Sequence, residues 1–121
     1  MGFFPHDKKL ADAAEQARDF LAELPVVVEG FRDCQVLLYQ AGADPHIDDP
    51  LGPWLPTAQL AERDRIVFYE CRSWGIPVAW NLAGGYQTYA GGGIGPVLDI
   101  HDNTMRACAA VSSPAYRDAL A

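Results

Sequence analysis

Four acidic or imidazole side chains follow a short apolar run that ends at residues 41–43. They are Asp44, His46, Asp48 and Asp49. A short apolar run between chain breakers is typical of a buried strand, and open α/β sheets bind ligands just past the carboxyl ends of their strands. Because Asp44 is the first polar side chain at that position, it is the leading candidate for a functional residue. On chemistry alone, it either binds a ligand or caps the turn that an Asp-Pro pair favours.

The other polar side chains of this loop have weaker claims to direct chemistry. Asp44, His46 and Asp48 alternate like the start of an EF-hand, but Asp49 stands where that loop requires glycine. One aspartate and one neighbouring histidine do not close a zinc site, because zinc takes three protein ligands even in open sites. We therefore interpret His46 as a solvated loop histidine. Asp48 and Asp49 are predicted to order the loop by accepting hydrogen bonds from backbone N–H groups.

A second group of candidate residues, Gly84, Gly85 and Tyr86, follows another apolar run at residues 77–82. Glycines let the backbone turn sharply and approach a ligand closely. A phenol in such a turn could donate a hydrogen bond to a developing oxyanion. Tyr86 is therefore either a catalytic residue or an ordinary turn aromatic.

The segment between the two apolar runs decides where these groups lie. Residues 57–74 are predicted to form a helix with Thr57 as its N-cap, and Arg63 is among the charged residues expected to face away from its apolar stripe. A strand, a helix and a strand in this order form a βαβ unit with parallel strands and a right-handed crossover. The loops after the two strands should therefore share one edge of the sheet, which brings Asp44 near Tyr86.

The flanking segments are predicted to be mostly helical. Apolar positions recur every three or four residues over residues 9–24, which predicts a helix that Pro25 interrupts. Residues 26–28 then form either a strand, by the propensity of three valines, or a further helical turn. Residues 91–95 are rich in glycine, but without a lysine they do not match a phosphate-binding motif. Pro96 is predicted to begin the last helix.

The composition is that of one modest acidic domain. The chain has 121 residues, of which 50% are hydrophobic, and a formal net charge of -7. A net negative charge argues against nucleic acid, whose phosphates require clustered Lys and Arg. No apolar run approaches the roughly 20 residues of a membrane span, and we expect no signal peptide. The three cysteines, Cys34, Cys71 and Cys108, fit a reducing cytosol as small core residues, so we expect a cytoplasmic protein.

Three segments of the chain form a recognisable series. They are Leu-Leu-Tyr-Gln-Ala-Gly-Ala-Asp-Pro-His-Ile-Asp-Asp-Pro-Leu-Gly (37–52), Gly-Ile-Pro-Val-Ala-Trp-Asn-Leu-Ala-Gly-Gly-Tyr-Gln (75–87) and Ile-His-Asp-Asn-Thr (100–104). In sequence, order and separation they resemble the C-terminal third of the histone deacetylase superfamily, which includes acetylpolyamine amidohydrolases and acetoin-utilisation-type proteins. The likeness covers about residues 25–111. The Gly-Ala-Asp…Asp-Pro-Leu-Gly motif followed by Gly-Gly-Tyr is fairly specific, whereas either part alone would be weak.

The resemblance implies a role for each residue of the site. Asp44 matches an aspartate that, with two upstream residues, holds a catalytic zinc. Tyr86 matches the tyrosine whose hydroxyl polarises the acetyl carbonyl and stabilises the tetrahedral intermediate, and Gly84 and Gly85 match the glycines that set its turn. In the family, the zinc is a Lewis acid that activates a water, and a histidine pair transfers protons. The substrate there is an acetylated amine, such as acetyl-lysine or an acetylpolyamine.

The chain also departs from the family pattern. The His-His pair and the Asp-x-His ligand pair of the family lie upstream, and nothing in this sequence matches them. Asp44-Pro45-His46 has the spacing of the ligand pair but the sequence context of the later ligand. We therefore expect one metal ligand of three, at best a slight affinity for zinc, and no activity by this chain alone. The alternatives are an active amidohydrolase completed by another chain and a non-enzymatic nucleotide-binding module that uses residues 91–95.

The resemblance finally implies a fold. It is an α/β fold, a partial three-layer parallel sheet with flanking helices like the C-terminal part of the arginase-like deacetylase fold. Residues 1–24 would form an N-terminal helical segment, and residues 25–121 the incomplete C-terminal part of the domain. Parallel strands are buried on both faces and need neighbours, so both sheet edges would be bare. We therefore expect the chain to pair with itself or with a missing N-terminal half.

Overall fold

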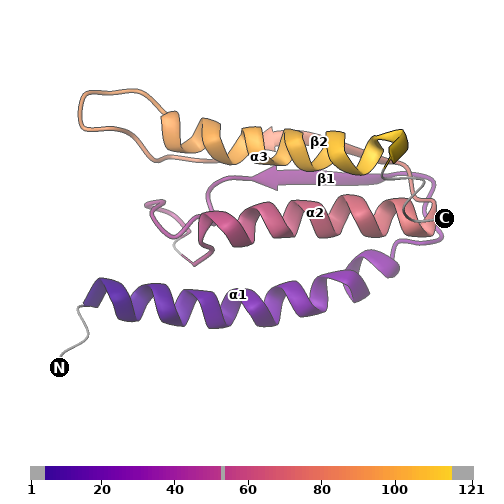
Figure 1. Cartoon of the computed structure of the whole chain (residues 1–121), viewed down its shortest axis with the longest axis horizontal. Helices are drawn as coiled ribbons and strands as arrows, with labels where there is room; N and C mark the ends of the chain where they lie inside the picture. The colour runs from indigo at the N-terminus through magenta and orange to yellow at the C-terminus, as the bar shows by residue number, and fades with distance from the viewer. Residues whose placement is uncertain (1–4, 53, 116–121) are drawn as a thin grey trace.

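Three helices and two strands alternate along the chain. The computed structural model describes residues 5–52 and 54–115. In chain order the elements are α1 (Pro5–Glu29), β1 (Leu37–Gly42), α2 (Thr57–Trp74), β2 (Val78–Ala83) and α3 (Gly95–Ser112) (Figure 1). This order confirms the predicted α/β class.

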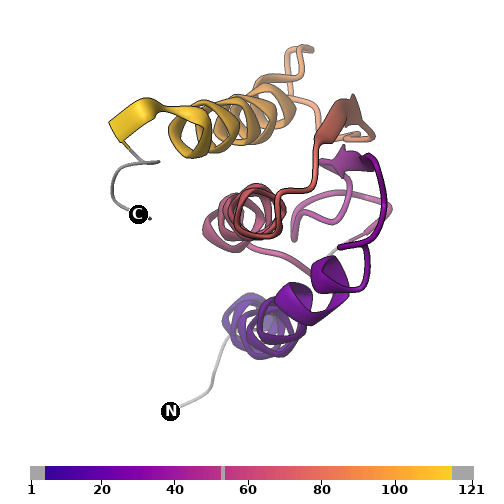
Figure 2. The same cartoon turned by 90° about the vertical axis from the view of Figure 1, so that its right-hand side faces the viewer.

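The two strands form a parallel pair. Leu37 pairs with Val78 at one end and Gly42 with Ala83 at the other. Since α2 connects the strands, this is the βαβ unit that the sequence predicts. Figure 2 shows all three helices on one side of the sheet. Three helices and two strands are too few to show the three-layer arrangement that the resemblance implies.

One face of the sheet is packed and the other is open. Along β1, successive side chains point to opposite faces. Leu37 and Ala41 are buried against the helices, whereas Leu38 points the other way and is 80% exposed. Within residues 5–52 and 54–115, no element covers the face that carries Leu38 (Figure 2).

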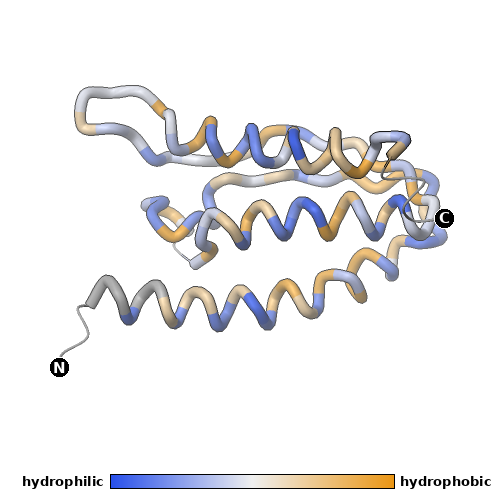
Figure 3. The backbone as a smooth tube through the Cα atoms, in the orientation of Figure 1, coloured by the Kyte–Doolittle hydropathy of each residue, from blue (hydrophilic) through white to orange (hydrophobic). Residues whose placement is uncertain are grey.

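Two clusters of apolar side chains hold the helices together and on the sheet. The first joins α1, β1 and α2 and includes Leu24 and Val67. The second joins the three helices with the loop after β1 and includes Leu55, Leu60 and Val97. Figure 3 shows hydrophobic and hydrophilic residues alternating along each helix, as expected when one helix face packs on a core. Among the described residues, no helix is both long enough and apolar enough to cross a bilayer.

α1 continues through Pro25 and ends at Glu29. The interruption predicted at Pro25 is therefore wrong, and so is the strand alternative for residues 26–28; the helical alternative is correct. Val28 is buried in the cluster with β1 and α2, and this packing outweighs the missing N–H group of Pro25. The helix thus runs across the predicted boundary between residues 24 and 25. Residues 1–4 of the predicted N-terminal segment lie outside the described residues.

The three cysteines are free and differ in burial. Cys71 is buried in α2, where desolvation raises the pKa of its thiol to about 11. Cys108 is half-buried. Cys34 is exposed, so the prediction of a core position is wrong for this cysteine.

Replacing Leu60 by alanine should destabilise the protein strongly. Leu60 is 1% exposed, and truncating a buried leucine costs about 2–5 kcal/mol. Leu98→Ala on α3 is the matched control, because Leu98 is 51% exposed; it should change the free energy of unfolding by less than about 0.5 kcal/mol. Urea denaturation followed by circular dichroism measures both variants. Equal decreases in the free energy of unfolding for the two variants would contradict the core position of Leu60.

Candidate functional site

The carboxyl ends of β1 and β2 lie side by side and carry Asp44 between them. The Ala43 N–H group donates to the Ala83 carbonyl oxygen at 2.9 Å, which extends the strand pairing by one residue. A Cβ atom built on Gly84 would lie 2.1 Å from Asp44 Oδ1, and one built on Gly42 would lie 2.7 Å from it. The Asp44 carboxylate therefore occupies space over both strand ends that only glycine leaves open. The loops after the two strands share one edge, as predicted.

Asp44 has no partner among the described side chains and backbone groups. No residue in the described part of the chain donates a hydrogen bond to its carboxylate or forms an ion pair with it. The side chain is half-buried and lies close to the Gly42 and Gly84 backbones, so its position is restricted. A held, unpartnered carboxylate at a strand end is suited to binding a cation or a hydrogen-bond donor of a ligand.

His46 is buried and fully engaged, so its interpretation as a solvated histidine is wrong. It is 6% exposed. Its Nδ1 accepts a hydrogen bond from the Asp48 N–H group at 3.0 Å, which places the proton of the neutral ring on Nε2. Nε2 then donates to Thr57 Oγ1 at 2.7 Å. Burial lowers the pKa of His46, and the nearby carboxylates of Asp48 and Asp49 oppose this shift. With both nitrogens used, the ring has no free lone pair for a metal.

Thr57 has a different role from the predicted one. The N-cap of α2 is Pro56, and no side chain caps the helix. Thr57 instead uses its hydroxyl for His46. The contact joins the loop after β1 to the first turn of α2, and a local capping signal does not reveal it.

Asp49 joins the two loops of the site. It is 2% exposed, and its Oδ1 accepts a hydrogen bond from the Leu51 N–H group at 2.8 Å. Its Oδ2 accepts from the Tyr86 N–H group, also at 2.8 Å. The prediction that Asp49 orders its loop through backbone N–H groups is confirmed, and the structure adds that it also fixes the turn after β2.

Tyr86 follows a turn that needs both of its glycines. Gly84 has a φ of 53° and Gly85 a φ of 105°, conformations that residues with a Cβ rarely adopt. A Cβ on Gly85 would also lie 2.6 Å from Val97 Cγ1. Tyr86 itself is 53% exposed, so its phenol is accessible to a ligand. Asp44 and Tyr86 thus lie on neighbouring loops, and neither is buried in the packed interior.

The residues that the structure describes do not fit a complete zinc site. The described residues contain no group of three or more His, Cys, Asp or Glu side chains that could hold a metal ion. His46 and Asp49 belong to the same loop as Asp44, but their polar atoms are already hydrogen-bonded. Asp44 is therefore a single donor where an open zinc site requires three protein ligands.

A buried polar network beneath the site was missed by sequence reasoning. Asp64 is fully buried and Arg63 is 6% exposed, so the prediction that Arg63 faces solvent is wrong. Both lie three to four residues from Leu60 and from Val67, within the apolar stripe of α2. A charged pair inside an apolar stripe is the sequence signal that could have identified this network.

The glycine-rich segment after the site has a structural explanation. The Gly92 N–H group donates to the Tyr89 carbonyl oxygen at 2.9 Å, which closes a turn. Gly92 and Gly93 have φ values of 90° and 93°. A Cβ on Gly95 would lie 2.4 Å from Tyr89 Cε2. Turn geometry and contact with the Tyr89 ring account for these glycines without a bound phosphate.

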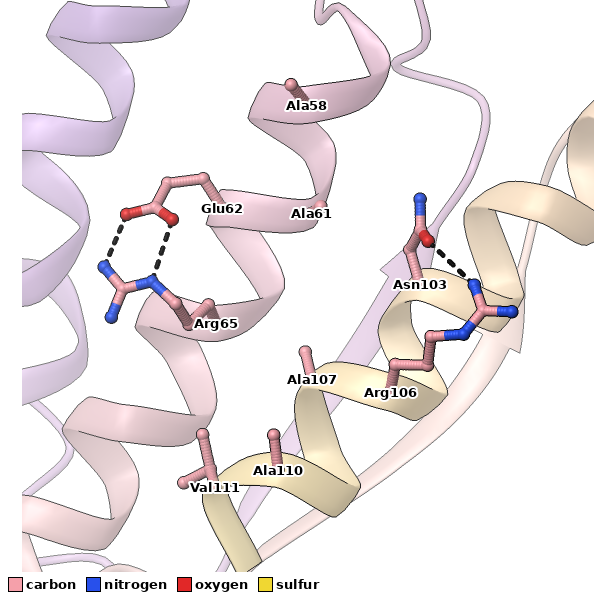
Figure 4. A pocket seen from close by; sticks show the side chains of 9 residues that line it. All are labelled: Ala58, Ala61, Glu62, Arg65, Asn103, Arg106, Ala107, Ala110 and Val111. Carbon is pink, nitrogen blue, oxygen red and sulfur yellow. Dashed lines mark hydrogen bonds and ion pairs between the residues drawn. The ribbon is translucent and has the colours of Figure 1, made fainter. Parts of the chain in front are cut away.

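A groove between α2 and α3 has a volume of about 390 Å³ (Figure 4). Its charged groups pair along their own helices, Glu62 with Arg65 and Arg106 with Asn103. The remaining wall consists mainly of alanine side chains. The groove contains none of the predicted site residues.

Comparison of the chain with known protein families, with curated proteins and with solved structures found no match.

Gly84→Ala should destabilise the protein and displace Asp44. The new methyl group would overlap Asp44 Oδ1, and a non-glycine residue held at positive φ costs roughly 1–3 kcal/mol. Gly91→Ala is the matched control, because a Cβ there meets nothing within 4 Å. Urea denaturation and the NMR chemical shift of the Asp44 carboxyl carbon report the two effects. A Gly84 variant as stable as the Gly91 variant would contradict the close approach.

Protonation of His46 should destabilise the fold at mildly acidic pH. Because burial lowers its pKa, the unfolded chain binds more protons than the folded one between the lowered value and about 6.5. The contribution of His46 to stability is therefore complete above the unfolded value and is lost as the pH falls toward the folded value. The thermal midpoint should drop from about pH 7 to pH 5.5 more steeply in the wild-type chain than in His46→Gln. Parallel pH profiles would exclude His46 as the cause.

Proposed function

We propose that this chain is the downstream part of a histone deacetylase-like domain, related to zinc-dependent enzymes that hydrolyse acetylated amines, and that it is inactive alone. Asp44 would be one ligand of the metal. Tyr86 would donate a hydrogen bond to the acetyl carbonyl. The observation that carries the proposal is an unpartnered carboxylate held over the tips of two parallel strands, beside a Gly-Gly-Tyr turn.

The geometry around the strand tips supports these roles. Gly42 and Gly84 leave the space in which the Asp44 carboxylate lies. Asp49 fixes the backbone of Tyr86 while the phenol remains half exposed. Protein groups that are already held in place before a ligand binds lose less conformational entropy on binding. The arrangement therefore suits a ligand-binding edge better than it suits an ordinary surface turn.

We also propose that β1 and β2 are neighbouring strands of a larger parallel sheet of the three-layer, arginase-like type. The open face with Leu38 supports this, because parallel sheets are normally covered on both faces. A missing N-terminal half would supply the remaining strands and helices.

The proposed inactivity follows from the polar groups that the chain contributes. A zinc site needs two more protein ligands, and both nitrogens of His46 are occupied. A phenol such as Tyr86 can polarise a carbonyl, whereas proton transfer in the resembled family is the task of a histidine pair that nothing in this sequence matches. Asp44 and Tyr86 could therefore bind and orient an acetyl group only as part of a larger site.

A second candidate function is an active amidohydrolase that another chain completes. An apolar groove of about 180 Å³ favours it, because this groove lies where the end of α1 meets β1. Its lining includes Val27, Phe31 and Leu38, all of which are substantially exposed. A second copy of this chain could cover such a surface, but it could not supply the missing His-His and Asp-x-His residues.

Reconstitution tests both functions. The chain alone with Zn²⁺ should release no acetate from an acetyl-lysine peptide or an acetylpolyamine. If the reading frame directly upstream encodes the missing residues, co-expression of its product should yield hydrolysis that a chelator abolishes. In that complex, Asp44→Ala should abolish activity and Tyr86→Phe should reduce it by roughly 10²–10³-fold. Tyr89→Phe is the control, since Tyr89 is 56% exposed on the following loop.

Two results would overturn these assignments. Hydrolysis by the chain alone that survives Asp44→Ala would contradict the role of Asp44 and the proposed inactivity. A folded complex that contains the upstream product but shows no hydrolysis would exclude the second candidate function.

A further inference from the structure

Arg63 and Asp64 form a buried charged pair that reaches the end of β1. Arg63 Nη1 donates a hydrogen bond to the Gly42 carbonyl oxygen at 2.8 Å. Its Nε donates to Asp64 Oδ1 at 3.0 Å. The guanidinium group therefore links the last residue of β1 to a carboxylate fixed in the interior.

The Gly42 carbonyl group is one that the sheet itself leaves unpaired. The N–H groups of Leu37 and Ala43 donate to carbonyl oxygens on the β2 side, so the odd-numbered residues of β1 pair with β2. In a parallel sheet, the residues between them direct their N–H and C=O groups to the opposite edge. Gly42 therefore points its carbonyl away from β2, where Arg63 is its hydrogen-bond partner.

Asp64 holds the guanidinium group from the other side. Its Oδ1 accepts a hydrogen bond from the Tyr39 hydroxyl on β1, and its Oδ2 accepts from Thr104 Oγ1 on α3 at 2.5 Å. Arg63 Nη2 lies 2.9 Å from Oδ1 as an ion pair without hydrogen-bond geometry. Because β1 and α3 both fix the carboxylate, the guanidinium group has little freedom to move.

We infer that Arg63 is a positioning residue for Asp44. By holding the Gly42 carbonyl, it fixes the backbone two residues before Asp44 and so sets the direction of the carboxylate over the strand tips. Without Arg63, the carbonyl would lose its partner, and the end of β1 would be free to move against Gly84. The importance of this positioning for function rests on the proposed role of Asp44. The effect of Arg63 on the conformation of Asp44 does not depend on that role.

NMR of the 121-residue chain tests the inference without metal or substrate. The variants are Arg63→Met and Arg63→Lys, and Arg65→Met is the control, because Arg65 is an exposed arginine on the same helix. Three-bond couplings report the χ1 rotamer of Asp44. Amide hydrogen exchange compares Ala43, directly after β1, with Leu60 in α2, whose N–H group donates to the carbonyl oxygen of the N-cap residue Pro56.

In Arg63→Met, Asp44 should average over several rotamers, and Ala43 should exchange at least about tenfold faster relative to Leu60. Arg63→Lys should show a smaller change, because an ammonium group can reach one acceptor but lacks the planar fork for two. Arg65→Met should change neither quantity. If Arg63→Met does not fold, Arg63→Lys decides by the same two measurements.

The inference would be overturned if Asp44 keeps a single rotamer in Arg63→Met and amide exchange at Ala43 and at Leu60 is accelerated by the same factor. Arg63 would then contribute only to overall stability. Because no hydrolysis is measured, this failure is distinct from failure of the proposed function, which reconstitution tests separately.

Discussion

A carboxylate with no exposure to water, Asp64, lies where β1, α2 and α3 meet. Removing a charge from water is costly unless it is paired and hydrogen-bonded, so the fold depends on its donors being in place. Arg63 supplies the opposite charge, while Tyr39 and Thr104 donate from two other elements. Burial raises the pKa of Tyr39, which keeps its hydroxyl protonated and able to donate. The network therefore specifies how three elements meet, where apolar packing alone would allow several arrangements.

The hydrophobic pattern of the sequence predicted most helices and strands and their order, because burial of strands and helix faces is periodic along the chain. It could not predict the direction of the polar groups within these elements. Arg63 was expected at the surface, since charged side chains are rarely buried unless they are paired. Its pairing depends on Gly42, Asp64 and, through Asp64, Thr104, which is 40 residues away from Asp64 in the sequence. Such a partner becomes visible only after the helices are placed.

Two other local signals were overridden by tertiary contacts. Pro25 is a helix breaker in isolation, yet α1 continues because the next turn buries Val28. Thr57 is a good capping residue, yet its hydroxyl serves His46. For the candidate site, residue types and topology predicted Asp44 and the Gly84–Tyr86 turn at one edge. The burial of His46 and the hydrogen bond from the Tyr86 N–H group to Asp49 could be recognised only in the three-dimensional structure. Both depend on contacts between residues whose separation in the sequence follows no helix or strand period.

The fixed parts of the site and the open parts of the sheet lie on different sides of β1. Polar contacts hold the strand tip from the helix side, and Asp49 holds the turn after β2 from the loop side. On the opposite face, Leu38 is 80% exposed. A partner that covered this face would meet loops that are already ordered, and the ordering of Asp44 and Tyr86 would not reduce its affinity. The ordering of the strand tip and of the turn after β2 therefore comes from contacts within this chain.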